Sequence, residues 1–120
     1  MKTLKIGSEF SKVPRGRYRS DGTASGERFR EDFLRNRLNS LSSGEKLQIV
    51  IDDEVEGYGS SFLVEGFAGM VKYGYMHANE LLAKIEIKYT NPDFAFYKRK
   101  IEQYINEAQF NSKAYEPTVE

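Results

Sequence analysis

Residues 47–63 decide the fold and read LQIVIDDEVEGYGSSFL. Residues 47–51 form a β-branched, almost continuously apolar run, which is typical of a parallel-sheet strand covered on both faces. An acidic turn follows, and the glycines on either side of Tyr58 allow a tight exit from the strand with positive φ angles. Apolar residues then recur at helical spacing over residues 60–73, so the sequence predicts a strand–turn–helix unit.

The flanking segments extend this pattern in both directions. Strand composition is found at residues 3–6 and 84–89, and helical spacing of apolar residues at residues 26–41, 79–83 and 94–108. Residues suited to the ends of these helices are Ser25, Gly74, Asn91, Pro92 and Asp93. Strands and helices that alternate in this order predict an α/β fold, with a small, mostly parallel β-sheet packed with about three to four helices.

Length and composition are those of one folded domain. The 120 residues suffice for a single core, which we place in residues 1–110, with a loop at residues 13–26 and a flexible C-terminal tail at residues 111–120. Basic and acidic residues both total 18, so the formal net charge is zero, which argues against a nucleic-acid binder. No apolar run approaches the ~20 residues of a membrane span and no signal peptide is recognisable, so we expect a cytoplasmic protein.

The residue inventory leaves few routes to catalysis. The chain has no cysteine and a single histidine, His77, which excludes thiolate sites and sites built from several histidines. We interpret His77 as a structural or surface residue because it has no conspicuous carboxylate partner in the sequence. Asp52 and Asp53 follow a strand, but without a neighbouring histidine we expect no metal there. The sequence therefore predicts a protein that is not an enzyme and needs no cofactor.

Two serines stand where the central turn, Gly57-Tyr58-Gly59, meets the helix. Backbone N–H groups at a helix start favour negative charge. Ser60 is in one interpretation simply the N-cap of this helix. In the other, Ser61 or Ser60 is a phosphoacceptor, and a phosphate would add about −1.5 to −2 charges at pH 7. Farther along, glycines at 66 and 69 weaken the helix interior, which indicates a close approach to a neighbouring element.

Seven of the eight arginines lie between Arg15 and Arg37. Guanidinium groups suit phosphate and carboxylate recognition, and an aromatic ring among them could stack on a base. The candidates for binding a phosphate or a partner are Arg15, Arg17, Tyr18, Arg19 and Arg28. If the loop folds over the Ser60–Ser61 turn, it could receive a phosphate there. The alternative is that these arginines pair with the acidic turn, namely Asp52, Asp53, Glu54 and Glu56.

The strand–turn–helix unit resembles that of STAS domains (sulfate transporter and anti-sigma factor antagonist). The resemblance lies in residues 50–52, 57–63 and 66–70. In bacterial anti-sigma factor antagonists this unit carries two serines, and a GHKL-type serine kinase phosphorylates the second, which corresponds to Ser61. The aspartate of that motif is replaced here by Gly59, and its glycine by Phe62.

Together with residues 15–22 and 25–30, this unit is similar to the STAS-like family DUF4325 over roughly residues 4–108. The resemblance implies a STAS-like fold in which the arginine-rich loop takes the place of the usual second strand. It also implies a regulatory module that binds a protein partner, with a GHKL-type ATPase or kinase as the expected partner and phosphorylation of Ser61 as the switch. The alternative is a module whose arginine-rich loop binds a nucleotide or another phosphorylated metabolite.

Overall fold

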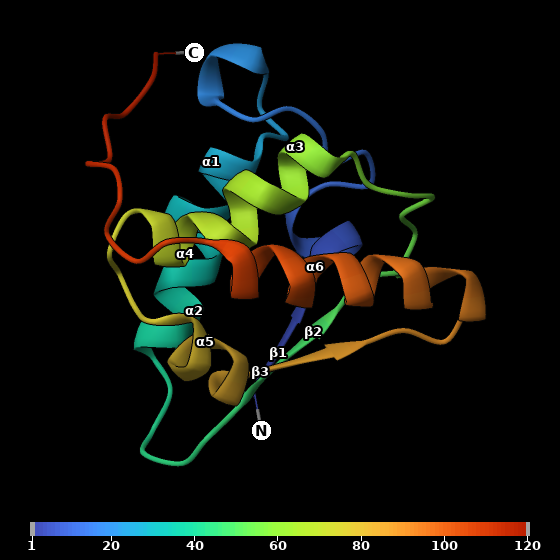
Figure 1. The fold of residues 1–120 in the computed structure, drawn as a ribbon. Coiled ribbons are helices and arrows are strands. Elements are labelled where there is room, and N and C mark those ends of the chain that lie inside the picture. Colours follow the sequence, from blue (N-terminus) through green and yellow to red (C-terminus); the bar gives the residue numbers. More distant parts are fainter. Residues whose placement is uncertain (1, 120) are drawn as a thin grey trace.

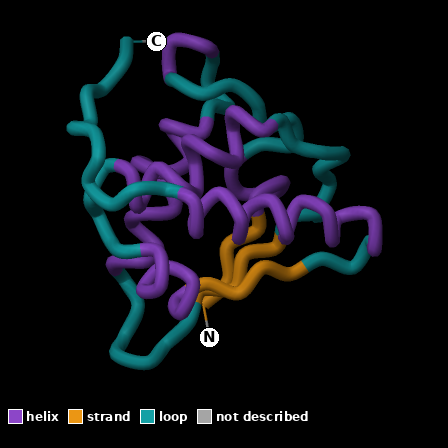
Figure 2. Tube along the Cα trace, in the orientation of Figure 1, coloured by secondary structure: helices purple, strands orange, loops and turns teal. Residues whose placement is uncertain are grey.

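A parallel sheet of three strands lies at one end of the protein in the computed structural model, which describes residues 2–119 (Figures 1 and 2). The strands are β1 (Lys2–Lys5), β2 (Leu47–Val50) and β3 (Ile85–Lys88), in the order β1-β2-β3. Their register aligns Leu4, Ile49 and Ile87, which are all buried. The predicted α/β fold with a small parallel sheet is confirmed.

Only one face of the sheet belongs to the hydrophobic core. Leu47, Ile49 and Ile51 are buried in that core, whereas Val50 lies on the opposite face and is partly exposed. Thr3, Gln48 and Glu86 share a register position on this second face and are also partly exposed. The expectation that β2 is covered on both faces is therefore wrong, because the helices supply apolar side chains to one face alone.

Two long helices pack against each other. The first long helix (residues 26–39) joins α1 (Gly26–Arg28), a π-helical segment (Phe29–Leu34) and α2 (Arg35–Asn39) without a break. The second long helix (residues 60–72) joins α3 (Ser60–Leu63), a π-helical segment (Val64–Ala68) and α4 (Gly69–Lys72). Two further helices are α5 (Ala78–Lys84) and α6 (Ala95–Glu107).

Shorter helical turns complete the chain at Ile6–Phe10, Arg19–Asp21 and Pro92–Phe94. The predicted capping residues are confirmed: the Ser25 hydroxyl accepts a hydrogen bond from the Arg28 N–H, and the Asn91 side chain accepts one from the Asp93 N–H. Gly74 follows the second long helix with a φ of 82°, a conformation that favours glycine. No helix within residues 2–119 has the length and apolar composition needed to cross a membrane.

The two long helices cross where glycine faces glycine. A Cβ atom on Gly26 would lie 2.7 Å from the Phe62 carbonyl oxygen and 2.8 Å from the Gly66 nitrogen. Both are backbone atoms, so the helices could not keep this distance with any larger residue at position 26. The close approach predicted from the glycines of the second long helix is confirmed, and it places α1 directly against α3 and the segment that follows it.

We expect the Gly26→Ala substitution to destabilise the protein by about 1–3 kcal/mol, because the added methyl group forces two backbones apart. Gly66→Ala is the matched control. Its Cβ would meet Phe29 Cδ2 at 3.2 Å, which a small shift of the ring relieves, and alanine is the better helix former. Urea unfolding of the three proteins measures the difference, and equal losses in both variants would contradict this account of the crossing.

Candidate functional site

The acidic turn after β2 organises the backbone at the carboxyl edge of the sheet. Asp53 accepts hydrogen bonds from the N–H groups of Gly7 and Ser8, each at 3.0 Å, just after β1. Asp52 accepts hydrogen bonds from the N–H groups of Thr90 (2.7 Å) and Asn91 (2.8 Å), just after β3. These hydrogen bonds lower the pKa of Asp52, although its partial burial acts in the opposite direction. The two aspartates thus connect three chain segments.

Tyr58 anchors the turn that leads to the serines. Its hydroxyl donates a hydrogen bond to the Ile51 carbonyl oxygen at 2.6 Å, and its ring stacks on Phe62. Gly57 lies close to Tyr97, since a Cβ atom there would lie 2.6 Å from the Tyr97 hydroxyl and would displace that side chain. The predicted positive φ angles of the flanking glycines are wrong: Gly59 has a φ of −81°, and the left-handed residue of this turn is Glu54, with a φ of 62°.

Ser60 and Ser61 occupy the first turn of α3 with different surroundings. The N-cap is Gly59, so the interpretation of Ser60 as the capping residue is wrong; the Ser60 side chain is exposed. Ser61 is half-buried, and its Oγ accepts a hydrogen bond from Arg17 Nη2 at 3.4 Å. The arginine-rich loop therefore does fold over the turn, and Arg17 is the residue that reaches a serine hydroxyl.

Arg19 pairs with the first long helix, and Arg28 is itself a residue of that helix. Arg19 donates to both carboxylate oxygens of Asp32, at 3.0 and 2.8 Å, and lies 3.8 Å from Glu27. Arg28 donates to the Thr23 carbonyl oxygen and covers the rings of Phe10 and Phe33. The predicted pairing with the acidic turn, Asp52 to Glu56, is therefore wrong for these arginines. The reason is that the loop packs along the helix that carries Glu27 and Asp32.

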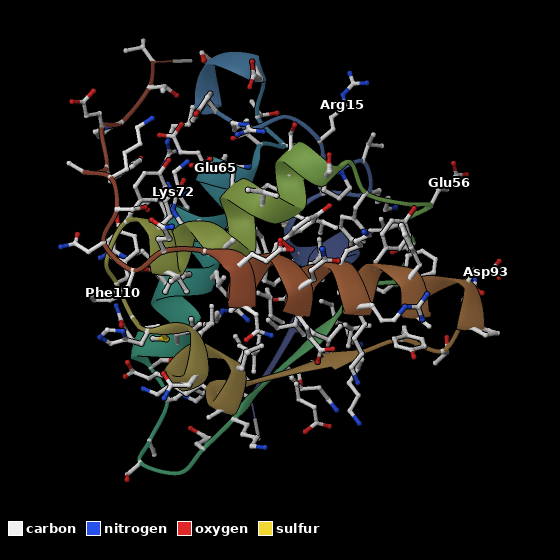
Figure 3. The ribbon with its side chains drawn as sticks, in the orientation of Figure 1. Arg15, Glu56, Glu65, Lys72, Asp93 and Phe110 are labelled. Carbon is white, nitrogen blue, oxygen red and sulfur yellow. The ribbon has the colours of Figure 1, made fainter. Side chains whose placement is uncertain are left out.

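Arg15 and Tyr18 are placed differently from Arg17. No residue within the described range 2–119 bonds to the Arg15 guanidinium, and Figure 3 shows this side chain projecting away from the protein. Arg15 also lines an open hollow of ≈ 440 Å³, together with Ser11, Val13, Asp21, Gly22, Thr23 and Ala24. Tyr18 is half-buried, and its backbone N–H donates to Asp21 Oδ2 at 2.9 Å.

Glu27 is a central residue of the loop that the sequence analysis did not single out. Its side chain is fully buried, and it accepts hydrogen bonds from the Arg19 N–H (2.9 Å), the Tyr115 hydroxyl (2.6 Å) and the Thr118 hydroxyl (2.6 Å). Burial alone would raise the pKa of the Glu27 carboxyl, but these hydrogen bonds outweigh it and lower the pKa to about 2. A glutamate in the first turn of a helix is common, so nothing in the sequence marks it as buried.

The segment after α6 is a second feature that the sequence did not reveal. The structure places it along the second long helix, where the N–H of Asn111 donates to the Val71 carbonyl oxygen at 2.9 Å. Figure 1 shows the segment running from the end of α6 past α4 to the turn at Arg19–Asp21. The Tyr115 ring lies against Tyr73 on the way. The segment is held mainly by polar contacts of side chains that are not regularly spaced. Its sequence therefore shows no hydrophobic periodicity that would predict this position.

Other potential sites carry little chemistry. His77 is exposed and its ring stacks on Phe110 with centroids 3.6 Å apart, in line with its interpretation as a surface residue. Residues 2–119 contain no group of three or more His, Cys, Asp or Glu side chains arranged to hold a metal ion. Comparisons with family models, with curated proteins and with solved structures find no match to the chain.

The lowered pKa of Glu27 predicts a specific acid sensitivity. An unfolded glutamate titrates near pH 4.3, so the stability that Glu27 contributes is present above that pH and is lost as the pH falls toward 2. We expect the Glu27→Gln variant to be less stable than the wild type at about pH 7 by on the order of 3 kcal/mol. This gap, the difference in the free energy of unfolding between the two proteins, should narrow steadily between about pH 4.5 and 2.

Urea unfolding at a series of pH values measures this gap. The carboxyl of Asp52 also has a lowered pKa, but it is present in both proteins and its hydrogen bonds do not involve Glu27, so its contribution cancels in the difference. A gap that stays constant as the pH falls would contradict the assignment.

Proposed function

We propose that this chain is a non-enzymatic, cytoplasmic regulatory module that binds a protein partner through the Gly57–Ser61 turn and the adjoining arginine-rich loop. Phosphorylation of Ser61 is the switch. In agreement with the STAS-like resemblance, the expected partner is a GHKL-type ATPase or kinase.

The observation that carries this proposal is the contact of 3.4 Å between Arg17 Nη2 and Ser61 Oγ. A phosphoryl group on Ser61 would bring its oxygens within hydrogen-bonding distance of a guanidinium that already lies beside the hydroxyl. Arginine binds phosphate oxygens with two parallel N–H donors, and such charged hydrogen bonds are about twice as strong as neutral ones. The start of the second long helix also favours negative charge at this position.

The surroundings of the turn support recognition by another macromolecule. Ser60, Gly59 and Glu56 are exposed, and no atom lies within 4 Å of the position of a Gly59 Cβ. Arg15 projects beside this surface without an internal partner among the described residues. A phosphate on Ser61 would therefore add negative charge at an accessible turn and occupy Arg17, so a partner that binds the unmodified surface would lose affinity.

Phosphate mapping on the protein purified from its native cells tests the switch. We expect phosphate on Ser61 and none on Ser60. In the phosphorylated protein, ³¹P NMR should report a second phosphate pKa below the usual value of about 6, because Arg17 stabilises the dianion. Arg17→Ala should return this pKa toward 6. An unmodified Ser61 under all growth conditions, or a phosphate pKa that does not respond to Arg17→Ala, would contradict the proposal.

Binding to the expected kinase from the same cells tests the regulatory role. The Ser61→Asp variant should bind the kinase at least about tenfold more weakly than the wild type, the effect of a new charge in an interface. Ser60→Ala is the control and should bind as the wild type does. Unchanged binding of Ser61→Asp would exclude the switch.

The hollow beside Arg15 favours a second candidate function. Its volume of ≈ 440 Å³ is in the range of small-molecule sites, and its unpartnered guanidinium suits a phosphate. In this function the arginine-rich loop binds a nucleotide or another phosphorylated metabolite. Arg17 does not take part, because its guanidinium is hydrogen-bonded to Ser61.

A thermal-stability screen against nucleotides and phosphorylated metabolites tests this second function. A ligand at about 100 times its Kd should stabilise the wild type by about 2.7 kcal/mol. Arg15→Ala should abolish the stabilisation, whereas Arg17→Ala should retain it. No stabilisation by any member of a broad panel would exclude this function.

A further inference from the structure

The segment after α6 converges on one buried carboxylate. Glu27 accepts the Tyr115 hydroxyl at 2.6 Å, the Thr118 hydroxyl at 2.6 Å and the Thr118 N–H at 3.1 Å. The Tyr115 ring also lies over the Arg30 guanidinium, 5.0 Å from its centre. Three donors from four consecutive residues (115–118) thus meet a side chain that has no contact with solvent.

The same carboxylate holds the arginine-rich loop. Its Oε1 accepts the Arg19 N–H at 2.9 Å, and the backbone N–H of Glu27 donates to the Arg17 carbonyl oxygen at 3.0 Å. The Thr118 hydroxyl oxygen additionally accepts the Ser20 N–H at 3.3 Å. The loop backbone is therefore held between the first long helix on one side and residues 115–118 on the other.

Arg17 lies within this held stretch. The Gly26 N–H donates to the Gly16 carbonyl oxygen at 3.0 Å, so residues on both sides of Arg17 are bonded to the start of the first long helix or to Glu27. The backbone thus fixes the point from which the Arg17 side chain extends to Ser61. Residues 115–118 contribute to this arrangement through the Ser20 contact and through the Glu27 carboxylate, which also accepts the Arg19 N–H.

We propose that residues 115–118 form a latch: docked on Glu27, they position Arg17 over Ser61 and so restrict access to the Ser61 hydroxyl. Tyr115, Thr118 and Glu27 are positioning residues in this arrangement. Residues 114, 116, 117 and 119 are exposed, so opening of the latch releases mainly the side chains of Tyr115 and Thr118 and can occur as a local event. The biological meaning of the latch rests on the proposed function, but its mechanical effect does not.

Amide hydrogen exchange in the full chain tests whether the latch holds the loop. The double variant Tyr115→Phe/Thr118→Val keeps the shapes of both side chains and removes their hydroxyls. We expect the Arg19 and Ser20 amides to exchange at least about tenfold faster in this variant, the factor expected for loss of hydrogen bonds to a charged group. Tyr104→Phe is the matched control, because its hydroxyl has no hydrogen bond within residues 2–119. Unchanged exchange of Arg19 and Ser20 would overturn the latch.

Thiol reactivity tests whether the latch restricts access to position 61. The chain has no cysteine, so Ser61→Cys introduces a single thiol whose reaction with a soluble maleimide is a direct measure of access. We expect Tyr115→Phe/Thr118→Val to increase this rate at least about threefold, since a local opening governs the reaction. The thiol of Ser60→Cys, at an exposed position, should react at the same rate with or without the latch substitutions.

The outcomes separate the latch from the proposed function. If the Arg19 and Ser20 amides exchange faster but the maleimide reaction of the Ser61→Cys thiol is unchanged, residues 115–118 do not control access to position 61. If both rates rise while the native protein never carries phosphate on Ser61, the latch stands and the phosphorylation switch falls. Unfolding midpoints of the variants in urea confirm that each comparison concerns folded protein.

Discussion

The rest of the structure depends on the hydrogen bonds and ion pairs that the buried Arg30 guanidinium makes. It donates to the carboxylate of Glu31 (2.7 Å), and to both the carbonyl oxygen (2.7 Å) and the carboxylate (3.0 Å) of Glu65. Burial by itself would lower the pKa of Arg30, but the carboxylates of Glu31 and Glu65 outweigh it and raise that pKa. Removing a charge from water costs several kcal/mol, so this arrangement is stable only with all of these partners in place.

This cluster explains why the two long helices lie so close together. Arg30 belongs to the first and Glu65 to the second, and a Cβ atom on Gly69 would lie 2.6 Å from Arg30 Nη1. Tyr73 donates to the Glu65 carboxylate, whose other oxygen lies 3.9 Å from Lys72 Nζ (Figure 3). The crossing of Gly26 and Gly66 lies about one turn before Arg30 and Gly69, and the close approach at Gly69 lets Arg30 Nη1 reach Glu65.

The candidate site is a consequence of that crossing. With the start of α1 held against α3, the loop that precedes α1 lies beside the first turn of α3, and Arg17 reaches Ser61. The Tyr115 ring lies against the Arg30 guanidinium and its hydroxyl bonds to Glu27, which lies about one turn before Arg30 in the first long helix. The Arg30 cluster, the arginine-rich loop and residues 115–118 are therefore connected by direct contacts. A change at the end of the described chain can reach the serines through two hydrogen-bonded residues, Glu27 and Arg17.

Local sequence determined the elements and where they begin. The apolar runs at the strands, the helical spacing of apolar residues, and the capping roles of Ser25, Gly74 and Asn91 all depend on neighbours a few residues away. The position of Ser60 and Ser61 at the start of a helix likewise depends on neighbouring residues in the sequence.

Only the tertiary structure decided which charges meet. Glu27 and Asp32, rather than Asp52 to Glu56, receive Arg19, and the hydroxyls of Tyr115 and Thr118 reach Glu27 from about 90 positions away in the chain. Hydrophobic periodicity records which face of an element is buried. It contains no information on which polar side chains lie opposite one another once the helices cross, because that depends on the distance that two glycines and one buried arginine allow.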